Sequence, residues 1–452
     1  MANKSTSFRV GRVQGYLRGK VWYLCYHDHG QRHRPRLGPD REAARQLAAQ
    51  INAQLEIGAP TALSFEPISI PDLRHRWLEH HEQVLRSSIQ TINRYRTATD
   101  HLLRFLEQHP VRYASHFRGS HAEQFVRHLR ALRVSPNGHA NTPRRPLMDK
   151  GLRYVLECCR ALFNYAARRR HLPPYAENPF AALEIDRIPV GEARPITLFS
   201  EEQERAFLEA CDDWQFPLFL TLMLTGLRPG ELTHLLLPED LDLDAGLLRV
   251  RNKPRLGWQV KTRNEREVPL VPALAEVLRI HLGGRRTGPV FRRRRYAGGP
   301  SGLLNSPTLA ALEQEWAAQI AAREEVAGRP LSRAERAGLA RGLWRDLGAV
   351  KGDRVRVEFM RLTRSIGLPG CTAPKVLRHL FATALQEGRV DPLIRNELMG
   401  HVAAGERTAG HGLGMSAVYT HTRPEHRRRQ LELALADRVA VAVAQEWVGK
   451  RR

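Results

Sequence analysis

A tyrosine near the C-terminus, Tyr419 in VYTH, follows an ordered series of basic residues. The series consists of Arg228 in TGLRPGEL, Lys261 in VKTRNEREVPL, Arg378 in KVLRHLFAT and His401 in LMGH. A tyrosine hydroxyl can attack a phosphodiester when cationic donors hold the phosphate and stabilise the charge that develops on it. The types and order of these residues therefore indicate nucleophilic chemistry at a phosphate.

That chemistry divides into four tasks. A phosphoryl transfer needs a nucleophile, neutralisation of the non-bridging oxygens, a proton acceptor, and a proton donor for the leaving oxygen. A guanidinium presents a planar fork that matches two phosphate oxygens, which an ammonium group cannot copy. Arg228 and Arg378, which come from different segments, are therefore the candidates to clamp one phosphate.

The composition favours a polyanionic partner. The 452 residues include 71 Lys+Arg and 47 Asp+Glu, a formal net charge of +24. Nucleic acid is the natural interpretation, although an arginine-rich proteome would also raise the charge. The five scattered cysteines are odd in number and contain no C-x-x-C pair, which argues against a disulfide framework or a zinc site and fits a reducing cytoplasm. No run approaches the ~18 apolar residues of a membrane span, so no membrane partner is expected.

The first of the elements that must position the site is a small basic unit at 1–58. VWYLCY is strand-like, HDHG is a turn, QRHRPRLG is a returning strand, and a helix follows with Asp40 as its cap. Such a small sheet has little core, so it is expected to present three arginines for DNA contact: Arg32, Arg34 and Arg36. The alternative is a solvated basic face on an accessory domain.

A linker leads to a predicted helical bundle at 66–185, whose helices carry an apolar stripe on one face and arginines on the other. The basic rim suits the DNA backbone, because Lys and Arg release its counterions. The candidate contacts are Arg94, Arg96, Arg168 and Arg169. For any single arginine here, a solvated helix face is the alternative.

The third unit, 195–440, is expected to hold the chemistry. WQFPLFLTLMLTG is nearly all apolar and must be a buried helix, which ends in the GLRPG turn. Short strands are expected at LLRV, WQVK and REVPL. The stretch 292–358 is interpreted as an insertion without assigned chemistry, helical from 307 to 347. Residues 441–452 are separated as a basic tail. The fold class is therefore mostly α with small β-hairpins.

The motifs resemble the tyrosine recombinase (phage-type integrase) family from about 197 to 436. TGLRPGEL is similar to its first arginine box, VKTRNEREVPL to its β-hairpin lysine segment, KVLRHLFATAL to its H-x-L-R-H-x-F-A-T box, LMGH to L-L-G-H, and VYTH to its closing Y-x-H segment. The N-terminal hairpin and helix resemble, over a short pattern, the arm-site-binding domain of such integrases.

The resemblance implies a role for each matched residue. Tyr419 is the nucleophile, Lys261 the general acid to the leaving 5′-oxygen, and His401 a donor to the phosphate. Arg228 and Arg378 are the two phosphate clamps. The supporting positions are Glu231, which holds the first arginine, and His379, a structural or hydrogen-bonding neighbour of the second.

This sequence departs from the family pattern at two points. The first histidine of the H-x-L-R-H box is Lys375 here, and a lysine binds phosphate but is a poor base unless its pKa is lowered. The proton acceptor for Tyr419 therefore stays open. The gap from His401 to Tyr419 is about twice the usual one and contains a second Gly-His pair at His411. Distance to the tyrosine favours His411, whereas the flanking NELMGH favours His401.

The resemblance implies that a helical DNA-binding domain and a catalytic domain clamp double-stranded DNA. It also implies a site-specific recombinase, which cleaves and rejoins the DNA through a 3′-phosphotyrosyl intermediate. Such a reaction uses no metal, ATP or other cofactor. It further implies a homo-tetramer on DNA, accessory DNA-bending or directionality proteins, and a cytoplasmic, nucleoid-associated location. Two alternatives stay open: type IB topoisomerase-like relaxation, and a catalytically silent DNA-binding protein. The segment after Tyr419 either docks on a neighbouring subunit or packs on its own domain.

Overall fold

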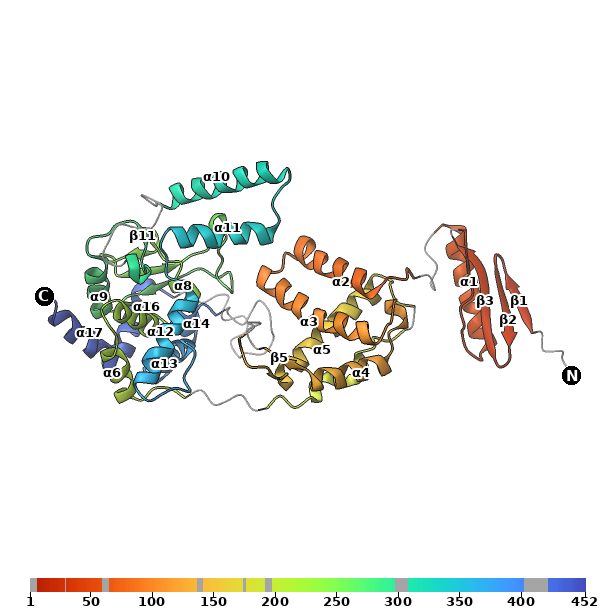
Figure 1. Cartoon of the computed structure of the whole chain (residues 1–452), viewed down its shortest axis with the longest axis horizontal. Helices are drawn as coiled ribbons and strands as arrows, with labels where there is room; N and C mark the ends of the chain where they lie inside the picture. The colour runs from red at the N-terminus through yellow and green to blue at the C-terminus, as the bar shows by residue number, and fades with distance from the viewer. Residues whose placement is uncertain are drawn as a thin grey trace. The chain divides into compact units, whose positions relative to one another are not determined.

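The computed structural model describes residues 6–28, 30–58, 65–135, 141–173, 176–191, 197–296, 308–401 and 422–452. The chain forms two compact units, Met1–Ala193 and Arg194–Arg452. Both are built mostly of helices with small antiparallel sheets (Figure 1), so the predicted fold class is confirmed. No helix of the described part is both long and apolar enough to cross a membrane.

The first unit opens with a four-stranded antiparallel sheet and one helix. The strands, in the order of the sheet, are β1 (Ser7–Val10), β2 (Val13–Arg18), β3 (Val21–Asp28) and β4 (Gln31–His33). Helix α1 (Arg41–Glu56) begins where the Asp40 carboxylate accepts hydrogen bonds from the backbone N–H groups of Glu42 and Ala43, as predicted. The sequence indicated β3, β4 and α1, but β1 and β2 were missed.

A helical bundle with its own core follows in the same unit. Its helices are α2 (Ile70–Glu79), the π-helix η1 (His80–Val84), α3 (Ile89–Gln108), α4 (Gly119–Ala131) and α5 (Asp149–Arg168). Three short 3₁₀ turns, η2 (Ala114–His116), η3 (Ala181–Leu183) and η4 (Ile185–Arg187), and the strand pair β5 (Arg133–Val134) and β6 (Arg145–Pro146) complete it. Helix α5 packs against α2, α3 and α4, and its apolar face is fully buried, as its periodicity predicts.

The second unit is organised around the apolar helix α7 (Gln215–Thr225), of which every residue is buried. Before and after it come α6 (Glu201–Glu209), α8 (Pro229–Leu232) and α9 (Pro272–Leu282). A three-stranded sheet has the order β10 (Arg266–Pro269), β9 (Leu247–Val250) and β8 (Leu241–Asp242). Strand β7 (Leu236–Leu237) pairs with β11 (Gly288–Pro289).

The strand predicted at WQVK is wrong. Residues 251–265 form the β9–β10 loop, with a 3₁₀ turn η5 (Pro254–Leu256) and a single antiparallel bridge between Lys253 and Trp258. Pro254 and Gly257, which has φ +66°, favour a turn over a continuous strand.

The helical prediction for 307–347 is confirmed. Helices α10 (Leu309–Ala327) and α11 (Arg333–Asp346) lie side by side (Figure 1) and share an apolar cluster that is separate from the main core and also contains Leu236 and Leu256. Helix α12 (Gly352–Ser365) instead buries Val355, Phe359 and Leu362 in the main core of the unit. The part of 292–358 with a separate core is therefore the α10–α11 pair, which we call the helical hairpin.

The remaining helices close the unit. They are α13 (Lys375–Glu387), α14 (Pro392–Met399), α16 (Pro424–Leu435) and α17 (Val439–Gly449); one further short turn is η6 (Arg294–Tyr296). Most of the segment expected to be a basic tail lies in α17, which packs on α6, α7 and α9 of its own unit. Trp447 stacks on Phe216 with ring centroids 4.9 Å apart, and Glu446 pairs with Arg205 at 3.2 Å.

Candidate active site

The first arginine is positioned by a sharp turn between two helices. Helix α7 ends at Gly226, which has φ +61° and lies so close to the Phe381 ring that an added Cβ would be 2.3 Å from it, so only glycine fits. Arg228 then caps α8: its backbone N–H donates to Oε2 of Glu231 at 2.9 Å, and its Nη1 donates to Oε1 at 2.7 Å. The Arg228 side chain is fixed but still 23% exposed.

Glu231 is shared with a second guanidinium, that of Arg266. Nη2 of Arg266 donates to Oε2 of Glu231 at 2.7 Å, and its Nε donates to the carbonyl of Leu398 at 2.8 Å. Both side chains of this pair are almost fully buried, at 3% and 2% exposure. Burial alone would raise the pKa of Glu231, but the hydrogen bond and charge of Arg266 and the hydrogen bonds from Arg228 outweigh it and lower the pKa.

Arg266 is a site residue that sequence reasoning missed. The resemblance of its segment to the lysine motif assigns a role to Lys261 and none to Arg266. A signal existed: in β10 the residues Arg266 and Val268 share the buried face of the strand. An arginine at a position that alternates with buried apolar residues indicates a buried ion pair.

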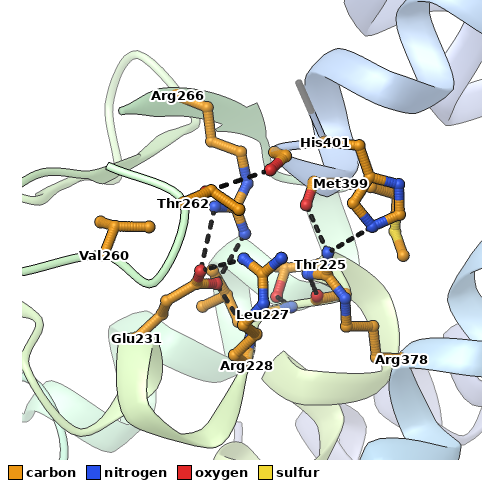
Figure 2. Close-up of polar contacts among 12 residues, drawn as sticks. Thr225, Leu227, Arg228, Glu231, Val260, Thr262, Arg266, Arg378, Met399 and His401 are labelled. Atoms are coloured by element: carbon orange, nitrogen blue, oxygen red, sulfur yellow. Dashed lines mark hydrogen bonds and ion pairs between the residues drawn. The ribbon is translucent and has the colours of Figure 1, made fainter. Parts of the chain in front are cut away.

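Arg378 approaches the same place from α13 and is buried. Its Nη1 donates to the carbonyl of Gly226 and its Nη2 to the carbonyl of Met399. Burial, followed by the charge of Arg228, lowers the pKa of Arg378 to about 10, which leaves it protonated at neutral pH. Its hydrogen bonds join the end of α7 to the end of α14 (Figure 2).

His401 follows α14 directly and meets Arg378, with its Nε2 3.3 Å from Nη2 of the arginine. A guanidinium can only donate, so Nε2 accepts and the ring proton lies on Nδ1. Burial, followed by the charges of Arg378, Arg228 and Arg266, lowers the pKa of His401. At neutral pH the ring is therefore uncharged and offers one N–H donor.

The described residues thus form a cationic site. Arg228 and Arg266 pair with one carboxylate, Glu231, and the guanidinium of Arg378 lies beside them, so the cluster has two positive charges in excess. An uncompensated charge of this size at a partly open site favours an anion, and a tetrahedral oxyanion fits donors that come from several directions.

Lys261 lies on the β9–β10 loop. Its side chain is exposed, and the next residue, Thr262, donates its hydroxyl to the carbonyl of Gly400 at 3.3 Å. Figure 2 shows Thr262 beside Arg266 and the chain that leads to His401. The loop that carries the predicted general acid is therefore tied to the residue before the predicted phosphate donor.

Lys375 and His379 lie at the first turn of α13, Lys375 exposed and His379 half-buried. Burial and the charges of Lys375 and Arg378 lower the pKa of His379. Within the described ranges, neither side chain hydrogen-bonds to the arginine cluster. Tyr419 and His411 lie outside the described residues.

The chain is described again from Thr422, whose hydroxyl donates to Glu397 on α14 at 3.2 Å. Arg427 of α16 also pairs with Glu397, at 3.5 Å. The segment that follows Tyr419 by three residues is therefore bound to the helix that ends next to His401.

The arginines predicted to contact DNA are all exposed: Arg32, Arg34 and Arg36 around β4, Arg94 and Arg96 on α3, and Arg168 and Arg169 at the end of α5. The first three alternate with less exposed residues, so they share one side of the chain. Arg94 and Arg169 lie over the rings of Tyr154 and Tyr165, at 5.3 and 5.6 Å, which leaves their guanidiniums at the surface.

No protein-family model matches the chain, and no curated protein matches it. Solved structures do match. The lambda integrase tetramer bound to a Holliday junction is 17% identical and covers 91% of this chain and 99% of that one, with a TM-score of 0.46. The Tn1549 transposon integrase in complex with transposon right end DNA is 17% identical and covers 81% and 99%, with a TM-score of 0.47. XerA recombinase is 15% identical and covers 79% and 96%, with a TM-score of 0.30. Along most of its length, then, the chain is similar to solved structures of integrases and of a recombinase.

Proposed function

We propose that this protein is a site-specific DNA recombinase of the tyrosine recombinase class. The observation that carries the proposal is the convergence of Arg228, Arg378 and His401, from three separate segments, at a site with two excess positive charges. The order of these residues ahead of Tyr419 supports a phosphodiester as the anion and the tyrosine as its attacker.

In the proposed first step, the Tyr419 hydroxyl releases its proton to solvent and its oxygen attacks a backbone phosphorus. The P–O bond to Tyr419 forms as the P–O bond to the 5′-carbon side breaks, which leaves a 3′-phosphotyrosyl bond. Arg228 and Arg378 stabilise the charge on the non-bridging oxygens, and His401 donates from Nδ1. Lys375 adds positive charge from the start of α13. Loss of one such donor raises the barrier by about 3–4 kcal/mol.

The departing 5′-oxygen takes a proton from Lys261, whose side chain is exposed. A 5′-hydroxyl from a second DNA then attacks the phosphotyrosyl bond and reverses the step. One phosphodiester is made for each one broken, so the reaction conserves bond energy and needs no ATP.

Glu231 and Arg266 are positioning residues in this proposal. Glu231 holds the guanidinium of Arg228 through a hydrogen bond of 2.7 Å. Arg266 in turn holds Glu231, and Arg266 also binds the carbonyl of Leu398 at the end of α14. The clamp is therefore built before DNA arrives, which reduces the reorganisation needed at the transition state.

Double-stranded DNA is the proposed partner. The exposed arginines of β4, α3 and α5 supply phosphate contacts, which position a protein on a duplex without reading its sequence. Assembly as a homo-tetramer on DNA, with accessory bending or directionality proteins, belongs to the same proposal.

The test is covalent capture in EDTA. The purified protein is incubated with nicked DNA fragments that tile the flanks of its own gene, boiled in detergent, and examined for a protein–DNA adduct mapped by mass spectrometry. We expect an adduct on Tyr419 in the wild type and none in Tyr419→Phe, which should bind DNA with unchanged affinity. An adduct on another residue, or none on any fragment despite tight binding, would contradict the proposal and favour a silent DNA-binding protein.

A second assay separates recombination from relaxation. Two DNAs that carry the mapped site are mixed, and recombinant products are measured beside the relaxation of a supercoiled plasmid. A recombinase exchanges strands only when two sites are present, whereas a type IB topoisomerase-like enzyme relaxes a plasmid with no second site.

A further inference from the structure

The helical hairpin packs on the loop that carries Lys261. Its apolar cluster contains Leu312 and Trp316 of α10 and Leu343 and Trp344 of α11, and it also contains Leu256 of the β9–β10 loop. Trp258 of the same loop packs against this cluster. The loop therefore supplies part of the core of the hairpin, so neither can shift without opening apolar surface to water.

Two direct contacts fix where the hairpin meets the loop. The indole Nε1 of Trp344 donates to the carbonyl of Leu256 at 3.1 Å, and both groups are buried. At Gly257, an added Cβ would lie 2.5 Å from Cβ of Ala340, so the loop backbone runs directly against α11. Close approach of this kind holds a backbone more firmly than contact between long side chains does.

A stack of rings extends the contact toward the first arginine. Trp258 stacks on His234 with ring centroids 4.8 Å apart, and Trp344 meets the same His234 edge-on at 4.5 Å. His234 is joined through its Nδ1 to the carbonyl of Gly230 in α8, at 2.7 Å, and α8 is the helix capped by Arg228. The hairpin thus touches both the loop of the lysine and the helix of the arginine.

The base of the loop is anchored by a buried ion pair. Nζ of Lys253 lies 2.7 Å from Oδ2 of Asp240, with both side chains at 3% exposure or less. Lys253 also lies over the Trp258 ring, 5.3 Å from its centroid. Nε of Arg251 also pairs with Asp240, at 3.3 Å from Oδ1. The buried ammonium group of Lys253 tolerates little movement, because separation from Asp240 leaves its charge unpaired.

Within the loop, Asn252 transmits this anchoring to Lys261. Its side-chain oxygen accepts from the N–H of Val260 at 2.9 Å, and its side-chain nitrogen donates to the carbonyl of Arg263 at 3.0 Å. These two partners bracket Lys261 in the chain. Thr262 then ties the same turn to Gly400, beside His401.

We infer that the helical hairpin is a positioning element for the general acid: it holds the β9–β10 loop so that Lys261 protonates the leaving 5′-oxygen. This inference rests on the proposed function, because it takes Lys261 as the acid. It assigns a role to a segment for which the sequence indicated no chemistry. Since a positioned acid helps only the departing oxygen, the effect must depend on the leaving group.

The test compares two DNA substrates at the mapped cleavage site. One has the natural bridging 5′-oxygen, and in the other this atom is sulfur, so the P–S bond breaks and a thiolate departs without needing a proton. The main variant replaces residues 297–346 by a short Gly/Ser linker. A short linker can join the two ends because they lie close together: the N–H of Arg293 donates to the carbonyl of Gly348 at 2.9 Å. Trp344→Ala is a milder variant, and Gln314→Ala, on the exposed face of α10, is the matched control. Lys261→Ala is the reference for complete loss of the acid.

We expect Lys261→Ala to slow adduct formation by about 100-fold or more on the oxygen substrate, and the deletion to slow it by about 10-fold to 100-fold. Both should approach the wild-type rate on the sulfur substrate, and Gln314→Ala should match the wild type on both. Equal losses on the two substrates, or no loss in the deletion variant, would overturn the inference. A wild type that forms no adduct on either substrate would instead contradict the proposed function.

Hydrogen exchange gives a readout that does not depend on catalysis. Removal of the hairpin should increase exchange at amides of the loop, above all at Val260, whose N–H is bound by Asn252. Protection at α7, in the separate main core, should stay unchanged, which shows that the variant is folded. Unchanged protection of the loop would refute the positioning role whatever the protein does to DNA.

Discussion

The arginine cluster and the lysine loop hold their functional groups in opposite ways. The guanidiniums of Arg228 and Arg378 are bound directly, one by the Glu231 carboxylate and the other by the carbonyls of Gly226 and Met399. The ammonium group of Lys261 is exposed, and no residue of the described ranges binds it. The backbone on either side of it, however, is held by the Asn252 side chain, and Thr262 ties the same turn to Gly400.

The difference matches the two tasks that the proposed function assigns to these groups. Charge stabilisation is strongest when dipoles and cations are already in place, because nothing must reorganise as charge develops. Proton donation needs a group that can follow the leaving oxygen, so a free side chain on a fixed backbone suits it. The comparison predicts that substitutions in the cluster affect every substrate and the stability of the fold, whereas substitutions around the loop affect only reactions that need the acid.

The largest expected effect is that of Arg378→Lys. A lysine keeps the charge but replaces the two nitrogens that reach Gly226 and Met399 by a single one on a shorter side chain. The buried carbonyls then lose hydrogen-bond geometry, and the phosphate loses the planar pair of donors that a guanidinium presents. Adduct formation should fall by about 10²–10³-fold, on the oxygen and the sulfur substrate alike. Arg364→Lys, an exposed arginine of α12, is the matched control. If the sulfur substrate restored the rate of adduct formation in Arg378→Lys, the arginine cluster would respond as the lysine loop does, which would contradict the comparison.

The second prediction concerns stability. Glu231→Gln leaves Arg266 buried without its carboxylate, and loss of one partner of a buried pair costs about 3–5 kcal/mol. Urea denaturation at pH 7 should show this loss in Glu231→Gln, and no loss beyond about 0.5 kcal/mol in the exposed control Glu425→Gln.

The same pair should show a defined pH dependence. The pKa of Glu231 is lower in the folded chain than its ordinary 4.5, so the unfolded chain takes up the proton first as pH falls. The stabilisation is therefore complete above about pH 4.5 and is lost as pH falls through the folded pKa. The difference in the free energy of unfolding between wild type and Glu231→Gln should become smaller as pH falls below about 4.5. A difference that is constant from pH 7 to pH 3 would show that the charge of Glu231 is not what stabilises the cluster.

Local sequence patterns explain most of the fold and only part of the site. The buried helix α7, the cap at Asp40 and the helices of the hairpin follow from periodicity and end signals. The motif order brought attention to Arg228, Glu231, Arg378 and His401, which the structure places together. Their catalytic roles, and that of Tyr419 outside the described residues, remain predictions.

What was missed depends on contacts between distant segments. Arg266 pairs with Glu231, which is 35 residues away, and the sequence around Arg266 does not indicate which carboxylate it will meet. The bond from Trp344 to Leu256 spans 88 residues, so the composition of 307–347 predicts helices but not the surface that they cover. Local spacing determines which element forms, whereas the partner of a buried face is decided only when the whole unit packs.

The smallest and most discriminating effect should come from Asn252→Ala. This change removes two hydrogen bonds that bracket Lys261 and touches neither the arginine cluster nor the helical hairpin. Each such bond contributes about 0.5–1.5 kcal/mol, so the loop should loosen while the unit stays folded. We expect adduct formation to slow about 5-fold to 10-fold on the oxygen substrate and not at all on the sulfur substrate, a range consistent with partial loss of acid catalysis. An equal loss on both substrates would mean that the loop supports the arginine cluster through Thr262 and Gly400, and that the two regions work as one.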